Sequence, residues 1–153
     1  MVRLSDLPPE YADGLRKLPL PQFESTPWVA GPDLKTARVA IISTAGLHRA
    51  SDPKFAGGSG DYRLLPADLD YSELTMSHVS LNFDRSGFQQ DVGVVLPLEN
   101  LKQMAADGEI GSVARWHYSF MGATDPTRMV ETAPQVAKLL KEDGVDAAIL
   151  VPV

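Results

Sequence analysis

The stretch DPTRMVETAPQVAKLLKEDGVDAAILVPV, Asp125–Val153, decides the fold class of this chain. Its first two residues are a typical helix start, because an aspartate caps free backbone N–H groups and a proline fits the first helical turn. Apolar residues then recur at helical spacing until Gly144, where we expect the helix to end. The apolar run at 146–153 predicts a buried strand. A helix that leads directly into such a strand indicates a βαβ unit of a parallel sheet.

The same alternation of elements extends upstream of this stretch. The run RVAIIS at 38–43 is short, apolar and rich in β-branched residues, and therefore predicts a buried strand. Residues 97–108 predict a helix, with a proline at its entry and a glycine at its end. Further strands are expected at 61–65 (as an edge strand), at 74–81, at 92–96 and within 110–120. The sequence thus predicts an α/β fold with an open, mostly parallel sheet flanked by helices.

Two regions are distinguished by their composition. Residues 1–36 contain half of the twelve prolines and are expected to form a proline-rich N-terminal arm, because proline removes backbone donors from a sheet. Residues 37–153 are expected to form the α/β domain. Within the arm a short helix is expected at 9–17. The remainder either wraps over the domain or a partner, anchored by Phe23 and Trp28, or is a partly ordered tail.

Composition and charge exclude several classes of function. The net charge is −6 and no cluster of Lys or Arg is present, which argues against a nucleic-acid partner. No apolar run approaches the length of a membrane span, and the N-terminus lacks a signal-peptide core, so we expect a cytoplasmic protein. The chain has no cysteine, and therefore no disulfide, thiolate nucleophile or zinc–thiolate site of its own.

Polar residues with chemical potential follow the predicted strands. The set comprises His48, His78, His117, Ser43, Thr44, Asp84, Asp91, Arg115 and Ser119. If they converge at one edge of the sheet, they can hold a small anionic or zwitterionic ligand, since an arginine binds a carboxylate with two parallel hydrogen bonds. The alternative is that they are separate capping, loop and core residues. The residues alone leave both interpretations open.

Other kinds of site are disfavoured by spacing. His48, His78 and Asp91 lack the short-range separation of common metal-binding motifs, so no metal is expected. The nucleophile motif Gly-x-Ser-x-Gly is absent, which argues against a serine hydrolase. The glycine-rich segment at 57–60 has no Gly-Lys-Ser/Thr ending and no helix directly after it, so it is interpreted as a loop that does not bind phosphate.

Two longer segments carry a family resemblance. The first is HVSLNFDRSGFQQD at 78–91 followed by VVLPL at 94–98, and the second is GEIGSVA at 108–114 followed by HYSFMG at 117–122. In this order and spacing they resemble the selenoprotein B family of glycine, sarcosine, betaine and D-proline reductases. The similarity extends through the C-terminal residues and covers most of the chain from Arg38 onward. One departure is at 115–116, where the family favours a proline followed by an arginine.

The resemblance implies an oxidoreductase of amino-acid metabolism. Members of the family carry a selenocysteine or cysteine after a Val-Pro-Val-like strand end. The selenolate attacks the α-carbon of a small amino acid or betaine, which is held as an adduct of a pyruvoyl group on a partner subunit. A C–N bond is cleaved reductively, and a thiol reductant restores the enzyme. The resemblance therefore implies a selenocysteine downstream of Val153, in a chain truncated at its UGA codon and inactive by itself.

The resemblance also suggests which residues form the retained part of the site. His78, Asp91 and His117 are the catalytic candidates. Asp91 is expected to orient one of the two imidazoles, which then stabilises the selenolate or protonates the departing amine. The substrate-binding candidates are Ser43, Thr44, Arg115 and Ser119.

Two alternatives from other classes of protein remain. The first is a non-catalytic interaction subunit that docks on a larger partner through its proline-rich arm. The second is a small-molecule-binding or isomerase-type α/β module whose histidines and Asp91 perform acid–base chemistry without redox chemistry. The sequence does not distinguish among the possible substrates, the strand orders or the oligomeric states.

Overall fold

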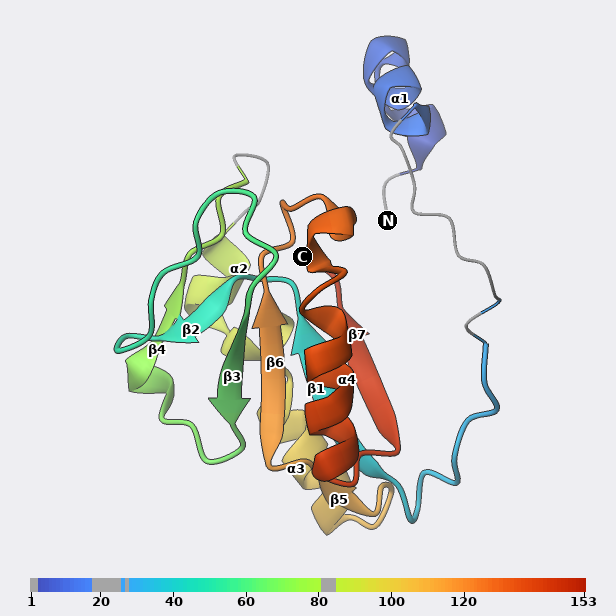
Figure 1. The fold of residues 1–153 in the computed structure, drawn as a ribbon, viewed down its shortest axis with the longest axis vertical. Helices are drawn as coiled ribbons and strands as arrows, with labels where there is room; N and C mark the ends of the chain where they lie inside the picture. Colours follow the sequence, from blue (N-terminus) through green and yellow to red (C-terminus); the bar gives the residue numbers. More distant parts are fainter. Residues whose placement is uncertain (1–2, 18–25, 27, 81–84) are drawn as a thin grey trace.

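A five-stranded, mostly parallel sheet forms the centre of the structure, a computed structural model that describes residues 3–17, 26, 28–80 and 85–153 (Figure 1). β1 (Arg38–Ser43) lies in the middle, and its residues from Val39 onward pair in parallel with the whole of β7 (Ala147–Val151). On its other side, the start of β1 pairs with β5 (Ser112–Val113) and its end pairs with β6 (Trp116–Phe120), both in parallel. β3 (Tyr62–Pro66) pairs antiparallel with β6 and forms an edge, as predicted for 61–65.

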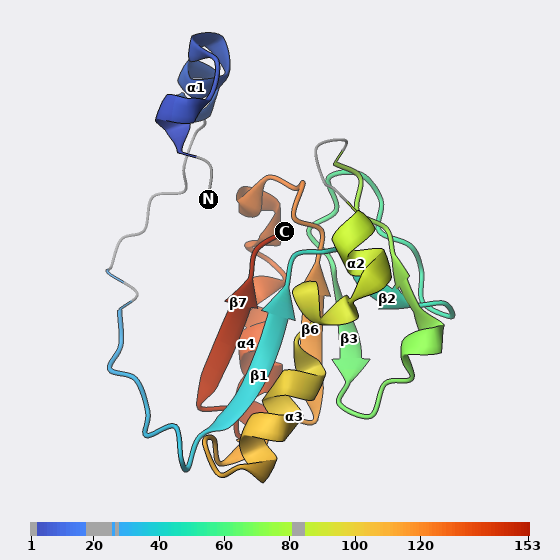
Figure 2. The ribbon, with the colours of Figure 1, turned by 180° about the vertical axis from the view of Figure 1, so that it is seen from behind.

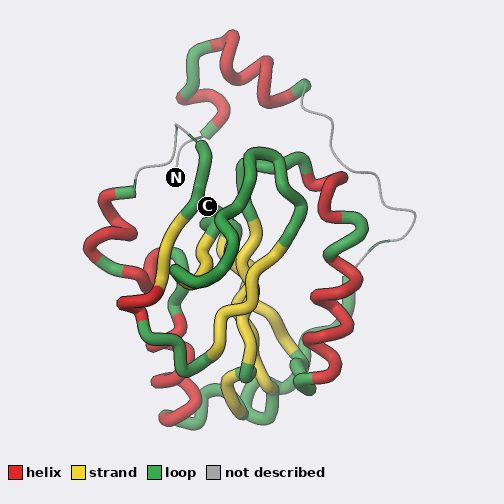
Figure 3. The backbone as a smooth tube through the Cα atoms, turned by 60° about the vertical axis from the view of Figure 1, so that its left-hand side comes forward, coloured by secondary structure: helices red, strands yellow, loops and turns green. Residues whose placement is uncertain are grey.

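Helices cover both faces of this sheet, which confirms the predicted fold class. α3 (Leu98–Ala106) packs on one face, where the main apolar cluster includes Ile41 and Leu101 (Figure 2). α4 (Ala133–Glu142) packs on the other face against a smaller cluster built around Tyr118 (Figure 1). Figure 3 shows the strands between helices on either side. The apolar side of each helix therefore packs on one face of the sheet.

A small second sheet lies beside β3 and was only partly predicted. It pairs β2 (Leu47–Arg49) antiparallel with β4 (Leu74–Met76), which follows the 3-10 turn η2 (Tyr71–Glu73). β2 was not predicted, because three residues directly after a glycine carry too short a pattern. The strand predicted at 74–81 ends at Met76, and residue 81 lies outside the described residues.

The strand predicted at 92–96 is wrong. These residues follow the short helix α2 (Ser86–Gln90) and form the 3-10 turn η3 (Val92–Val94). The carboxylate of Asp91 accepts the N–H of Gly93 at 2.7 Å and so starts a turn at a place where the apolar composition suggests a strand. The turn still buries Val95 and Leu96, which accounts for the misleading apolar run.

The helix predicted at 126–142 is divided in two. The 3-10 turn η4 (Pro126–Met129) begins at the expected cap, where the carboxylate of Asp125 accepts the N–H of Thr127 at 2.9 Å. α4 starts only at Ala133, and Pro134 explains the break, because its ring excludes a regular helical turn before it and it lacks an N–H to donate. Gly144 follows α4 with a φ of 69°, as expected for a helix-ending glycine.

The strand predicted within 110–120 is interrupted by a bulge between β5 and β6. Val39 and Ile42, three residues apart on β1, face Val113 and Tyr118, which are five residues apart. The carboxylate of Asp143, just after α4, accepts the N–H groups of Arg115 at 2.7 Å and Trp116 at 3.2 Å. Arg38 also donates to this carboxylate at 2.7 Å, so the donors freed by the bulge and a guanidinium share one acceptor group.

The N-terminal arm contains η1 (Leu4–Asp6) and the helix α1 (Pro9–Arg16), which was predicted. Trp28 is 88% exposed, so it does not anchor the arm on the domain, and Phe23 lies outside the described residues. In the part of the chain that the structure describes, no helix combines the length and apolar character needed to cross a membrane.

Candidate functional site

The carboxyl ends of β1, β6 and β7 meet near Val153, at one edge of the sheet (Figures 1 and 2). Thr44, directly after β1, accepts the N–H of Val153 on its hydroxyl oxygen at 2.8 Å. The N–H of Gly122, just after β6, donates to the carbonyl of Thr44 at 2.8 Å. A Cβ atom on Gly122 would lie only 2.6 Å from the carbonyl oxygen of Val153. Glycine is therefore required for the close approach of these three strand ends.

His78 lies at the same edge and is 4% exposed. Its Nδ1 accepts the N–H of Ser80 at 3.2 Å, so a neutral imidazole carries its proton on Nε2. Burial lowers the pKa of His78 below its usual range, and the charge of Arg85 acts in the same direction, while the backbone carbonyl of Val153 raises it. The result is a neutral imidazole at pH 7, beside Val153, which follows the end of β7 at Val151.

Arg85 fixes the backbone at this place. Its guanidinium donates to the carbonyl of His78. The guanidinium is thus engaged with a backbone group and contributes a positive charge next to the imidazole. Asp84, another member of the predicted set, lies outside the described residues.

Ser43 and Ser119 are completely buried below this edge. The hydroxyl oxygen of Ser43 accepts the N–H of Ala45 at 3.2 Å, and that of Ser119 accepts the N–H of Leu47 at 2.7 Å. Both hydroxyls therefore hold the loop that leads from β1 to β2. Ser43 and Thr44 were both predicted to bind substrate at the end of β1, and of the two only Thr44 is partly exposed.

His117 occupies the interior of the sheet. It is fully buried in β6, and its Nδ1 accepts the N–H of Ile41 at 3.0 Å, a donor that the bulge leaves without a strand partner. Burial lowers the pKa of His117 to about 4; the charge of Asp143 opposes this shift, and that of Lys102 adds to it. Its geometry is that of a core histidine that completes the pairing of β1.

Arg115 lies at the other end of β6. It is exposed and sits in the bulge that precedes the strand, whereas Thr44 and Ser119 lie at carboxyl ends. The length of β6, roughly 15 Å, separates the backbone of Arg115 from the edge that holds His78. The structure thus brings Thr44 and His78 together, and leaves Arg115 apart from them.

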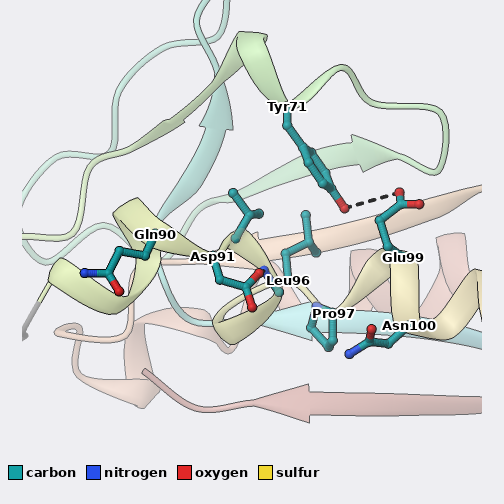
Figure 4. A pocket seen from close by; sticks show the side chains of 9 residues that line it. Tyr71, Gln90, Asp91, Leu96, Pro97, Glu99 and Asn100 are labelled. Atoms are coloured by element: carbon teal, nitrogen blue, oxygen red, sulfur yellow. Dashed lines mark hydrogen bonds between the residues drawn. The ribbon is translucent and has the colours of Figure 1, made fainter.

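Asp91 lines a separate pocket of about 320 Å³ (Figure 4). The pocket also contains Tyr71 and Glu99, whose hydroxyl and carboxylate lie 3.5 Å apart. Burial, together with the charges of Glu99 and Asp91, raises the pKa of Tyr71. The charges acting on the two candidate imidazoles come instead from Arg85, Asp143 and Lys102. The predicted pairing of Asp91 with an imidazole is therefore not found among the described residues.

Sequence reasoning overlooked the contact between His48 and Ser77. His48 is 1% exposed, and its Nε2 lies 2.7 Å from the hydroxyl oxygen of Ser77, which directly precedes His78. Ser77 stands next to His78 in the sequence, but no pattern in the sequence indicated that His48 would reach Ser77. Within the described part of the chain, no group of three or more His, Asp or Glu side chains is arranged to hold a metal ion.

Comparison with known proteins assigns the family. The family described as Glycine/sarcosine/betaine reductase selenoprotein B matches residues 13–153, and the chain belongs to this family. A D-proline reductase subunit gamma from Acetoanaerobium sticklandii is 31% identical over 121 residues, 77% of this chain. A glycine reductase complex component B subunit gamma from Carboxydothermus hydrogenoformans is 29% identical over 88% of this chain. A betaine reductase complex component B subunit beta from Peptoclostridium acidaminophilum is 26% identical, also over 88%.

These relatives are longer proteins and, by name, subunits of reductases. The chain spans 49% of the length of the D-proline reductase subunit and 32% of the glycine and betaine reductase subunits. No solved structure matches the chain.

Proposed function

We propose that this chain is part of a reductase subunit that cleaves a C–N bond of a small amino acid or betaine with a thiol as reductant. In such a reaction the C–N bond is replaced by a C–H and an N–H bond, while two thiols are oxidised to a disulfide. The observation that carries the proposal is the position of His78 beside Val153, at the carboxyl ends of the parallel strands, where α/β enzymes commonly place reacting groups. The alternative functions have no comparable observation in their favour.

We further propose that a selenocysteine or cysteine downstream of Val153 works at this edge. Such a residue, once deprotonated, supplies the nucleophile that displaces nitrogen from the α-carbon. The side chains present fit such a group, since the neutral imidazole of His78 lies against the backbone carbonyl of Val153 and so holds the end of the strand from which that residue would follow. A lowered pKa also favours this role of His78 over that of a resting general acid, because a neutral imidazole has no readily lost proton.

Thr44 and Gly122 position the strand end in this proposal. The hydroxyl of Thr44 holds the N–H of Val153, and Gly122 leaves space for the carbonyl of Val153. Together they orient the backbone from which the nucleophile would emerge. Ser43 and Ser119 support the loop behind them and have no direct role, while Asp91, His117 and Arg115 act outside the reacting group's immediate surroundings.

A partner subunit that bears a pyruvoyl group is part of the proposal. Support comes from the relatives, which are named as subunits of D-proline, glycine and betaine reductases. The chain also exposes large apolar side chains that a partner can cover, among them Leu150 on β7 at 71% and Val130 beside α4 at 68%. A cytoplasmic location is also proposed, because thiol-dependent chemistry suits a compartment in which thiols are kept reduced.

The test is an assay of the complete reductase, translated with recoding of UGA and combined with its partner subunit. With a dithiol, we expect product amine from one of glycine, sarcosine, betaine or D-proline, and none from residues 1–153 alone. His78→Ala in the complete enzyme should lower kcat roughly hundredfold, because the strand end that carries the nucleophile loses the imidazole that positions it. Val79→Ala changes the next, 45% exposed residue and serves as a matched control. Product formation by residues 1–153 alone, or unchanged kcat in His78→Ala, would contradict the proposal.

A further inference from the structure

We propose that His48 and Ser77 act as a pair of positioning residues that hold His78 against the carbonyl of Val153. The inference rests on the proposed role of His78 and extends it to two residues that touch neither the substrate nor the nucleophile. His48 belongs to β2, whereas Ser77 follows β4, so the pair also joins the two strands of the small sheet beyond their backbone pairing.

Both ring nitrogens of His48 have defined partners. Nδ1 lies 2.7 Å from the carbonyl oxygen of Arg49, which can only accept a hydrogen bond, so Nδ1 carries the proton of the neutral ring. Nε2 is then an acceptor, and the hydroxyl of Ser77 donates to it across 2.7 Å. The ring of Phe55 packs edge-on against the imidazole, with centroids 6.3 Å apart. The tautomer and the orientation of His48 are therefore determined by its surroundings.

The backbone connects this pair to His78. The N–H of Ser77 donates to the carbonyl of Gly46 at 2.9 Å, and the N–H of Gly46 donates to the carbonyl of Phe120, at the end of β6, at 2.8 Å. Gly46 has a φ of 68°, and a Cβ there would lie 3.1 Å from the backbone nitrogen of His78. Ser77 is thus held by its hydroxyl on one side and its N–H on the other, immediately before the imidazole that faces Val153.

This arrangement explains why a buried histidine and a serine occur away from the reacting edge. A hydrogen bond between two side chains with little freedom to move costs little entropy to maintain, and loss of one partner leaves the other unpaired in the interior. If Ser77 turns away, His78 loses the constraint on its backbone and gains access to water. Its pKa then rises toward the ordinary value near 6.5, because the loss of burial, the largest influence on this imidazole, outweighs the loss of the carbonyl of Val153.

The experiment is an NMR titration of the imidazole C2–H of His78 in residues 1–153, without substrate or turnover. In His48→Phe, which keeps an aromatic ring beside Phe55, and in Ser77→Ala, the pKa of His78 should shift upward. The double variant should shift it no further than either single change, since both remove the same interaction. His48→Gln, whose amide can still bond to the Ser77 hydroxyl, should restore much of the wild-type value.

Thr132→Val is the matched control, because the hydroxyl of Thr132 donates to the carbonyl of Gly60 at 2.6 Å in another part of the domain. It should lower stability to a similar degree and leave the titration of His78 unchanged. The inference is overturned if His48→Phe and Ser77→Ala lower stability but leave the pKa of His78 at its wild-type value. The outcome is separate from that of the reductase assay, so a failure of either is recognised by itself.

Discussion

His117 should make the domain sensitive to acid well above the pH at which carboxylates titrate. Its imidazole is fully buried, accepts the N–H of Ile41 through Nδ1, and has a pKa lowered by burial to about 4. In the unfolded chain the pKa returns to about 6.5. Between these values the unfolded chain binds the proton and the folded chain does not, so stability is complete above pH 6.5 and decreases as the pH falls toward 4.

The magnitude follows from the difference between the two pKa values. Each unit of pH within this window removes up to about 1.4 kcal/mol, so that the free energy of unfolding at pH 5 is roughly 2 kcal/mol lower than at pH 8. The lowered pKa values of Asp52 and Asp143 act in the same direction, but only below the ordinary carboxylate range near pH 4. The window between pH 8 and pH 5 therefore isolates the histidines.

The assay is urea unfolding followed by far-ultraviolet circular dichroism at pH 8, 7, 6 and 5. His117→Gln keeps an oxygen acceptor for the N–H of Ile41 and cannot titrate, so most of the dependence on pH should disappear in this variant. A smaller dependence should remain, because the pKa of His78 is also lowered. Equal slopes against pH for the wild type and His117→Gln would refute the reasoning.

Two further changes test the bulge and the strand ends. Asp143→Ala leaves two backbone N–H groups and the guanidinium of Arg38 without their shared acceptor, and should lower the free energy of unfolding in urea by about 3 kcal/mol. The control is Lys138→Ala, which removes an exposed ion pair with a 3.7 Å separation and should leave stability nearly unchanged. Gly122→Ala forces a Cβ against the carbonyl of Val153, and should lower the free energy of unfolding by about 1–3 kcal/mol and shift the amide resonance of Val153. The control is Gly57→Ala, whose added Cβ has no atom within 4 Å, and it should change neither quantity.

The sequence predicted the elements whose patterns are local. The strand at 38–43, the helix predicted at 97–108 and observed at 98–106, and the terminal strand each have their own apolar period, and a glycine or proline lies near the ends of the helix and the terminal strand. The same reasoning failed at 92–96, because the apolar run there is buried by a turn that the side chain of Asp91 starts. It also joined η4 to α4, since helical periodicity outweighed the break at Pro134.

The positions of the candidate residues were predicted in part, for a similar reason. Placing polar residues at or after strands selected Thr44 and His78, and the structure places both beside Val153, because the carboxyl ends of parallel strands converge. The same reasoning also selected His117. This residue lies within β6 and not after it, so its imidazole accepts the N–H of Ile41 on β1. Arg115 lies at the far end because it precedes β6, in a bulge that no local signal in the sequence announces.

By itself, the sequence determined the α/β class, the order of the main elements and the family, because these depend on periodicity along the chain and on motifs that can be read in order. Only the tertiary structure decided which histidine faces Val153, which one fills the core, and which one holds Ser77. The three imidazoles are chemically identical. Their protons, pKa values and partners are set by strand register, by burial and by backbone groups from distant parts of the chain, and these exist only once the sheet has formed.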